Sequence, residues 1–228
     1  MIPVYAGFDP REEVGYHTFS SSLIHTSSEP VSIIPLHQGL MGKFYDAGDR
    51  DGTNSFIYLR FLIPYLQRYT GFAIFMDGAD MILKSDIVEL WNMRDEYKAV
   101  QVVKHDYRTK NPRKYIGTAM EADNRDYPRK NWSSVMILNC GHPAWNSVTP
   151  ESVKTHTGNY LHRFQFIPDN HIGELPISWN WMPQEHGDNP EAKLIHYTAG
   201  VPGFPAHKNG PMVEPWFDAL ERVNFAIS

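Results

Sequence analysis

Two aspartates, Asp77 and Asp80, directly follow a strongly apolar stretch and are separated only by a Gly-Ala pair. The five apolar residues at 72–76 predict a strand buried on both faces. Such a strand does not tolerate carboxylates, so it must end before Asp77. Gly78 lets the following loop turn sharply. We therefore expect both carboxylates at the carboxyl end of a core strand, where open α/β sheets bind their ligands.

This acidic loop has two interpretations. A turn with two solvated acids is one, because Asp and Gly are ordinary turn residues. A divalent-cation site is the other, because Mg²⁺ and Mn²⁺ take oxygen ligands and commonly bind through one or two carboxylates plus substrate phosphates.

The elements around the loop alternate between strands and helices. Strands are expected at 2–8, 31–36, 72–76, 98–104, 133–140 and 193–197, and helices at 12–27, 54–69, 86–93, 150–157 and 215–223. The strand–helix–strand opening predicts an α/β fold. The sequence has no internal repeat or Pro/Ser linker, so we predict one domain over residues 1–228. Asn54 or Ser55 is expected to cap the second helix, and Pro64 to kink it.

The composition, 42% hydrophobic and 21% charged over 228 residues, is ordinary for a soluble globular protein. A single cysteine, Cys140, excludes an internal disulfide and fits a reducing compartment. Residues 1–13 lack the features of a signal peptide, and no window approaches the roughly 18 apolar residues of a membrane span. We expect a cytoplasmic protein without stable membrane insertion.

The net charge of −5 argues against wholesale electrostatic binding of nucleic acid, although a nucleic-acid acceptor is not excluded. Between Lys104 and Lys130, however, eight of the 21 Lys and Arg residues stand against four acids. The stretch 105–131 has little periodicity and is predicted as a long loop, which in a compact domain is functional or mobile. Its charge is that of a solvated loop, or of a positive rim facing an anionic donor or acceptor.

Six motifs follow one another along the chain: YAGFD, YLRFLIPYL, FMDGADMILKSDIVELW, SSVMILN, PDNHIGELPISWNW and LIHYTAG. Their order resembles a nucleotide-sugar-dependent glycosyltransferase of the GT-A fold. It is similar to the retaining family of glycogenin and bacterial lipopolysaccharide galactosyltransferases, glycosyltransferase family 8. The likeness covers residues 2–217. It implies an α/β, Rossmann-like GT-A fold with a central, mostly parallel sheet flanked by helices, and transfer of a hexosyl or pentosyl group from a UDP-sugar to an unidentified acceptor.

The resemblance also implies a Mn²⁺ or Mg²⁺ site. The family motif is Asp-any-Asp, and Asp80 falls on its second aspartate, whereas Gly78 stands where the first would be. Asp77 lies one residue earlier, and a turn with one extra residue could still bring both carboxylates to one ion. His196 of the late HY motif would complete the site. From its apolar surroundings alone, it would be a hydrogen-bonded core histidine.

The resemblance assigns nucleotide-sugar binding to Asp77 and to four further residues. Arg60 and Lys208 would add positive charge near the diphosphate, and Gly200 belongs to the same loosely kept late motif. The alternative for Arg60 is a structural salt bridge to an acidic-loop aspartate. Asp9 ends the first strand, where the family contacts uracil or ribose, and its alternative role is to cap the next helix.

Asp169 and Asn170 match the position of an Asp-Gln pair near the transferred sugar in this family. A carboxylate or amide oxygen there would stabilise an oxocarbenium-like centre, which makes them the catalytic candidates. The same residues also form a plain turn sequence.

Two other functions compete with sugar transfer. A sugar nucleotidyltransferase shares the fold class but would want a Gly-rich phosphate loop after the first strand, and the sequence there has no such run. The second is a degenerate transferase that has kept the fold, lost the metal and binds a nucleotide or sugar without turnover, because fold does not guarantee function and the first metal aspartate is shifted.

Overall fold

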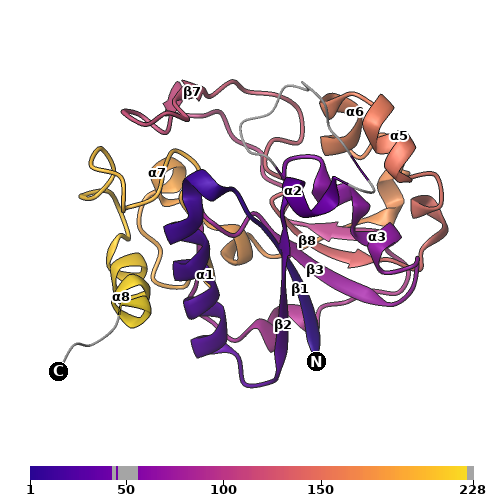
Figure 1. The fold of residues 1–228 in the computed structure, drawn as a ribbon, viewed down its shortest axis with the longest axis horizontal. Coiled ribbons are helices and arrows are strands. Elements are labelled where there is room, and N and C mark those ends of the chain that lie inside the picture. The colour runs from indigo at the N-terminus through magenta and orange to yellow at the C-terminus, as the bar shows by residue number, and fades with distance from the viewer. Residues whose placement is uncertain (43–44, 46–55, 225–228) are drawn as a thin grey trace.

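The structure is a computed structural model that describes residues 1–42, 45 and 56–224. Within this part of the chain, a six-stranded sheet runs in the order β2-β1-β3-β8-β5-β9 (Figure 1). Its strands are β1 Ile2–Gly7, β2 Val31–Leu36, β3 Phe72–Met76, β5 Val100–Val102, β8 Val135–Asn139 and β9 Ile172–Glu174. Only β8 is antiparallel to its neighbours, so the predicted α/β fold with a mostly parallel sheet is confirmed.

Side chains alternate along each strand, so the sheet has two apolar faces. Helices cover both of them. On β3, Ala73 and Phe75 belong to one apolar cluster, whereas Ile74 and Met76 belong to the other. The first cluster includes residues of α3 Ile63–Leu66, α5 Pro150–Thr155 and α6 Gly158–His162. The second includes residues of α1 Glu13–Thr26 and α4 Ile87–Trp91. The remaining short helices are α2 Gln38–Met41 and α7 Pro183–His186.

A separate two-stranded ladder lies beside the main sheet. It pairs β4 Met81–Leu83 antiparallel with β10 Leu194–His196, so that Met81 faces His196. Residues of this ladder pack against Trp216 of α8 Glu214–Val223. The ladder therefore joins the acidic loop to the late HY motif.

The helix expected at 54–69 is not continuous, so this prediction was wrong. A 3₁₀ turn, Leu59–Leu62, is followed by the single turn of α3, in which Pro64 occupies the first turn. Proline has no backbone N–H to continue the 3₁₀ hydrogen bonds, and Arg68 and Tyr69 then adopt positive φ angles of 54°. The expected cap at Asn54 or Ser55 lies outside the described residues.

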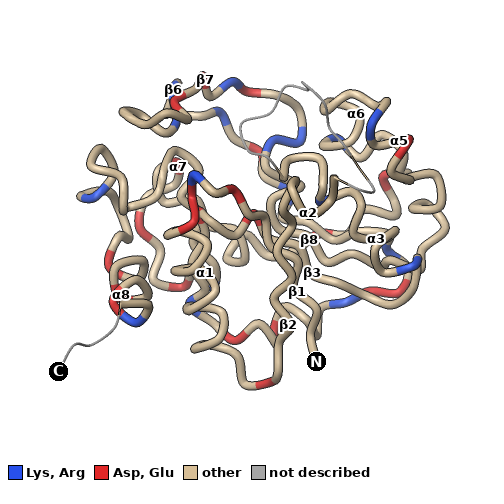
Figure 2. The backbone as a smooth tube through the Cα atoms, viewed as in Figure 1, with Lys and Arg blue, Asp and Glu red and all other residues tan. Residues whose placement is uncertain are grey.

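The stretch 105–131 is largely irregular, as predicted, but contains the hairpin of β6 Arg113–Lys114 and β7 Ala122–Asp123. Figure 2 shows Lys and Arg positions along this segment. The buried Glu185 of α7 accepts hydrogen bonds from Thr109 Oγ1 (2.5 Å) and from the backbone N–H of Lys110 (2.7 Å). The loop is thus tied to the body of the fold. No helix in the described part of the chain is long and apolar enough to cross a membrane.

Candidate metal centre

The acidic loop turns sharply where β3 ends. Asp77 still donates its N–H to the Ser134 carbonyl at 3.0 Å, and Gly78 then takes a φ of +84°. A Cβ at this glycine would also lie 3.2 Å from the Gly7 carbonyl oxygen, so the turn packs closely on the end of β1. The turn predicted at Gly78 is confirmed.

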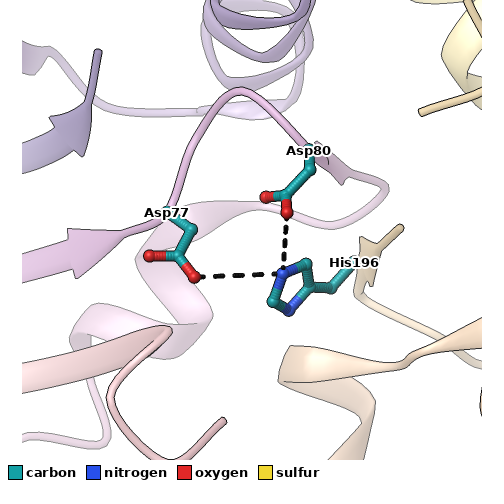
Figure 3. Close-up of side chains that lie close together, drawn as sticks. All are labelled: Asp77, Asp80 and His196. Atoms are coloured by element: carbon teal, nitrogen blue, oxygen red, sulfur yellow. Dashed lines mark hydrogen bonds and ion pairs between the residues drawn. The ribbon is translucent and has the colours of Figure 1, made fainter. Parts of the chain in front are cut away.

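The loop and β10 bring Asp77, Asp80 and His196 together (Figure 3). His196 Nε2 lies 3.2 Å from Asp80 Oδ2 and 3.9 Å from Asp77 Oδ2. One ligand atom of each residue lies within 4.8 Å of those of the others. The extra residue in the turn therefore does not keep Asp77 from the other two side chains.

Asn180 orients the imidazole of His196, and the sequence analysis missed this residue. Ser134 Oγ donates to the Asn131 carbonyl at 2.7 Å, so it accepts from Asn180 Nδ2 at 2.8 Å. The amide oxygen of Asn180 consequently faces His196 Nδ1 at 2.9 Å and accepts its proton. In neutral His196 this leaves Nε2, on the carboxylate side, as the ligand atom. An asparagine between two tryptophans in the WNW motif was the available signal.

The electrostatics of this cluster favour a positive charge between its side chains. Burial alone would lower the pKa of His196, but the Asp80 carboxylate, supported by Asp77, outweighs it and raises that pKa. Burial raises the pKa of Asp77, although Arg60 opposes the increase. Asp80 Oδ1 is buried and has no hydrogen-bond partner among the described residues. Positive charge is therefore favoured between these side chains, either as a proton on His196 or as a metal ion.

Arg60 makes the salt bridge that the sequence analysis considered as one alternative. Its Nη1 lies 2.6 Å from Asp77 Oδ1 and donates to the Ser133 carbonyl at 2.8 Å, and its guanidinium stacks over Phe75. Arg60 is buried, with 5% of its surface exposed. It holds Asp77 in place.

A pocket opens on this centre, and among the described residues Lys114 lines it whereas Lys208 does not. Lys114 lines the pocket together with Arg60 and the three clustered side chains. Within the described residues, its ammonium makes no hydrogen bond or ion pair and lies 5.4 Å from the centre of the Tyr115 ring, and burial lowers its pKa. Lys208 is exposed and is not among the residues that line the pocket. The role of Lys208 near a diphosphate therefore stays a prediction from the late motif.

Asp9 and Gly200 do not line this pocket either. Asp9 is buried, accepts from the backbone N–H of Arg11 at 3.0 Å and pairs with its guanidinium, which is the capping alternative. Gly200 has a φ of +139°, and a Cβ there would lie 2.6 Å from the His207 ring. Gly200 is therefore required by backbone geometry.

The structure does not bring Asp169 and Asn170 to the pocket. They precede β9, whose amino end lies beside the amino end of β5, whereas Asp77 follows the carboxyl end of β3. Asp169 is exposed and pairs with Arg129 Nη2 at 2.7 Å. The Asn170 carbonyl accepts from Lys98. The plain-turn alternative describes both residues, because a 3₁₀ turn begins at Asp169.

No protein-family model matches the chain. It is 37% identical over 230 residues to Protein CDI of Arabidopsis thaliana, covering 97% of this chain and 86% of that protein. The chain belongs to the Protein CDI family.

Solved structures share the fold of this Protein CDI family member. The apo structure of the bifunctional glycosyltransferase WbbM matches with a TM-score of 0.67 at 15% identity, over 96% of this chain and 49% of that one. Galactosyltransferase LgtC, in complex with donor and acceptor sugar analogs, matches with a TM-score of 0.56 at 9% identity, over 97% and 96%. Glycosyltransferase GlyE of Streptococcus pneumoniae TIGR4 matches with a TM-score of 0.59 at 14% identity, over 96% and 60%. The predicted GT-A fold is confirmed.

Proposed function

We propose that the chain is a metal-dependent glycosyltransferase that moves a hexosyl or pentosyl group from a UDP-sugar to an acceptor. The observation that carries the proposal is the cluster of Asp77, Asp80 and His196 at the carboxyl end of β3, in a GT-A fold. The proposal includes retention of configuration, as in glycosyltransferase family 8, a single domain over residues 1–228 and a cytoplasmic location. The motif order and the single cysteine support these further points.

The residues present fit a divalent cation. Two carboxylates and one imidazole suit Mn²⁺, and the carboxylates alone suit Mg²⁺. The buried, unpartnered Oδ1 of Asp80 is an oxygen that a cation or its bound water would satisfy. Asn180 fixes the tautomer of His196 that offers Nε2. Asp77, Asp80 and His196 would hold the ion.

A cation held by Asp77, Asp80 and His196 would stabilise the negative charge that develops on a diphosphate leaving group. Lys114 adds fixed positive charge on another wall of the same pocket and orients the diphosphate. Arg60 opposes the rise that burial causes in the pKa of Asp77, and its ion pair holds the Asp77 carboxylate at the pocket. Asp169 and Asn170 lie at the opposite edge of the sheet from this pocket, so we propose no contact between them and the sugar.

Isothermal titration calorimetry tests the proposal. UDP should bind tightly with Mn²⁺ or Mg²⁺ and at least about tenfold more weakly in excess chelator, since the pocket presents carboxylates to an anionic ligand. Asp80→Asn should abolish this metal dependence. Equal UDP affinity with and without metal would overturn the metal-bridged site.

Turnover separates the two other functions. The shift of Asp77 from the family motif and its ion pair with Arg60 favour a degenerate nucleotide-sugar binder as the second candidate. Such a binder would release no UDP from UDP-glucose or UDP-galactose over hours, whether or not its UDP affinity depends on metal. A nucleotidyltransferase would instead release diphosphate from UTP when supplied with a sugar 1-phosphate.

A further inference from the structure

A second pocket adjoins the one that contains the metal centre. It lies between the 105–131 segment and α6, and both pockets are lined by Ile57, Lys114, Tyr127, Asn131, His162 and Thr198. The shared wall makes the two pockets neighbours. A molecule in the second pocket would therefore face a donor held at the metal centre.

The charge of the second pocket is opposite to that of the whole chain. Lys114, Arg125, Lys130 and Arg163 line it, against the single acid Asp123. The chain as a whole carries 26 acidic and 21 basic side chains. This local excess of positive charge favours an anionic ligand.

Two of these cations are not neutralised within the described residues. Arg163 is half-buried, makes no ion pair there, and its Nε is buried without a hydrogen-bond partner. Lys114 likewise has no ion pair in the described structure. By contrast, Arg125 pairs with Asp123 at 3.0 Å, and Lys130 Nζ pairs with Asp126 Oδ1 at 3.4 Å. An unpaired, partly buried guanidinium is costly unless a ligand completes its hydrogen bonds.

The rest of the lining suits a saccharide. Side-chain amides of Asn124, Asn131 and Asn159 both donate and accept hydrogen bonds, as sugar hydroxyls require. Tyr58 and Tyr127 contribute aromatic rings, whose faces pack against the apolar faces of sugars. The pocket thus combines polar groups for hydroxyls with an excess of positive charge.

We propose that this second pocket binds the acceptor, and that the acceptor is a saccharide carrying a carboxylate or a phosphate. The inference rests on the proposed transferase function and specifies its acceptor class. Arg163 binds the anionic group, while the shared wall directs an acceptor hydroxyl toward the metal centre.

Ligand-observed NMR in the presence of UDP and Mg²⁺ tests the inference. The probes are glucose, glucuronate and glucose 6-phosphate, which differ in charge but share the same ring. At least one anionic sugar should bind about tenfold more tightly than glucose at low salt, and added salt should reduce the difference. Whichever of glucuronate and glucose 6-phosphate binds more tightly identifies carboxylate or phosphate as the anionic group.

Variants at Arg163 show whether positive charge in this pocket causes the preference for an anionic sugar. Arg163→Met should remove the preference for the anionic sugar, whereas Arg163→Lys should retain most of it. Arg222→Met, on the exposed surface of α8, should leave it intact. Thermal unfolding of each variant verifies that it is folded.

Two negative results have different meanings. If UDP does not bind the unmodified chain with metal, the proposed function itself is wrong. If UDP binds but the three sugars bind equally, or if Arg163→Met keeps the preference, only the acceptor inference is overturned.

Discussion

Asn180 and His196 are joined by a hydrogen bond of 2.9 Å between the amide oxygen and Nδ1, and both side chains are buried. Asn180 makes this bond while its own Nδ2 is held by Ser134. The nitrogen of His196 that faces the two carboxylates is thus determined by a residue that does not itself belong to the cluster.

Replacing Asn180 with alanine should weaken Mn²⁺ binding by about 10- to 100-fold, because the imidazole loses the partner that fixes its tautomer and orientation. Mn²⁺ titration followed by calorimetry measures the effect. Asn209→Ala, in an exposed loop, is the matched control. Unchanged Mn²⁺ affinity in a folded Asn180→Ala variant would show that ring packing alone orients His196.

Asp77→Asn should cost stability as well as metal affinity, because it leaves the buried Arg60 guanidinium without its carboxylate. Breaking a buried ion pair on one side costs about 3 kcal/mol. Urea unfolding of Asp77→Asn, Arg60→Met and the double variant would measure the coupling. The double variant should lose less than the sum of the single losses. Strict additivity would argue that the 2.6 Å ion pair contributes little.

Lys114→Met should weaken UDP binding in the presence of Mn²⁺ by about tenfold and uridine binding hardly at all, because its charge acts on the diphosphate. Lys208→Met should leave both affinities unchanged, since Lys208 is exposed outside the pocket. The reverse ranking of the two lysines would restore the role that the late sequence motif assigned to Lys208.

Glu12 should make stability depend on pH. Burial, followed by the charges of Asp80 and Asp9, raises its pKa from 4.5 to about 8. Between these values the folded state retains a proton that the unfolded state has released. This contribution to the free energy of unfolding is therefore complete below pH 4.5 and is lost as the pH rises through 8.

Glu12→Gln, which mimics the protonated acid, should remove this loss, so its advantage over the unmodified chain grows from pH 5 to about 9. Urea unfolding at several pH values provides the measurement. Glu13→Gln, at the exposed neighbouring position, is the control. A parallel pH profile for Glu12→Gln and the unmodified chain would contradict the assignment.

Local features of the sequence predicted strand β3 and the acidic loop after it well. The apolar run before Asp77 and the glycine after it are contiguous, so the strand end and the turn follow from neighbouring residues alone. The 54–69 helix failed because its apolar pattern does not distinguish a 3₁₀ turn from an α-helix, and Pro64 interrupts the hydrogen bonds.

The positions of His196 and Lys114 at the site depend on contacts between segments that are far apart in the sequence. His196 is 116 residues from Asp80, and only the family resemblance suggested that they meet. Lys114 lies on a two-residue strand inside a stretch without periodicity, so no sequence pattern predicts that its side chain lines the pocket. Tyr115, its neighbour, donates its N–H to the Ala199 carbonyl at 2.7 Å and anchors it there, a contact invisible in sequence.

The ladder between β4 and β10 makes the cluster of Asp77, Asp80 and His196 sensitive to the register of the two strands. Met81 faces His196, and the N–H of Tyr197 donates to the Asp80 carbonyl at 2.8 Å, so both ligand-bearing segments are aligned by the same backbone hydrogen bonds. A slip of one residue would turn the imidazole to the opposite face. We therefore expect a single-residue insertion within either strand to separate His196 from the two aspartates.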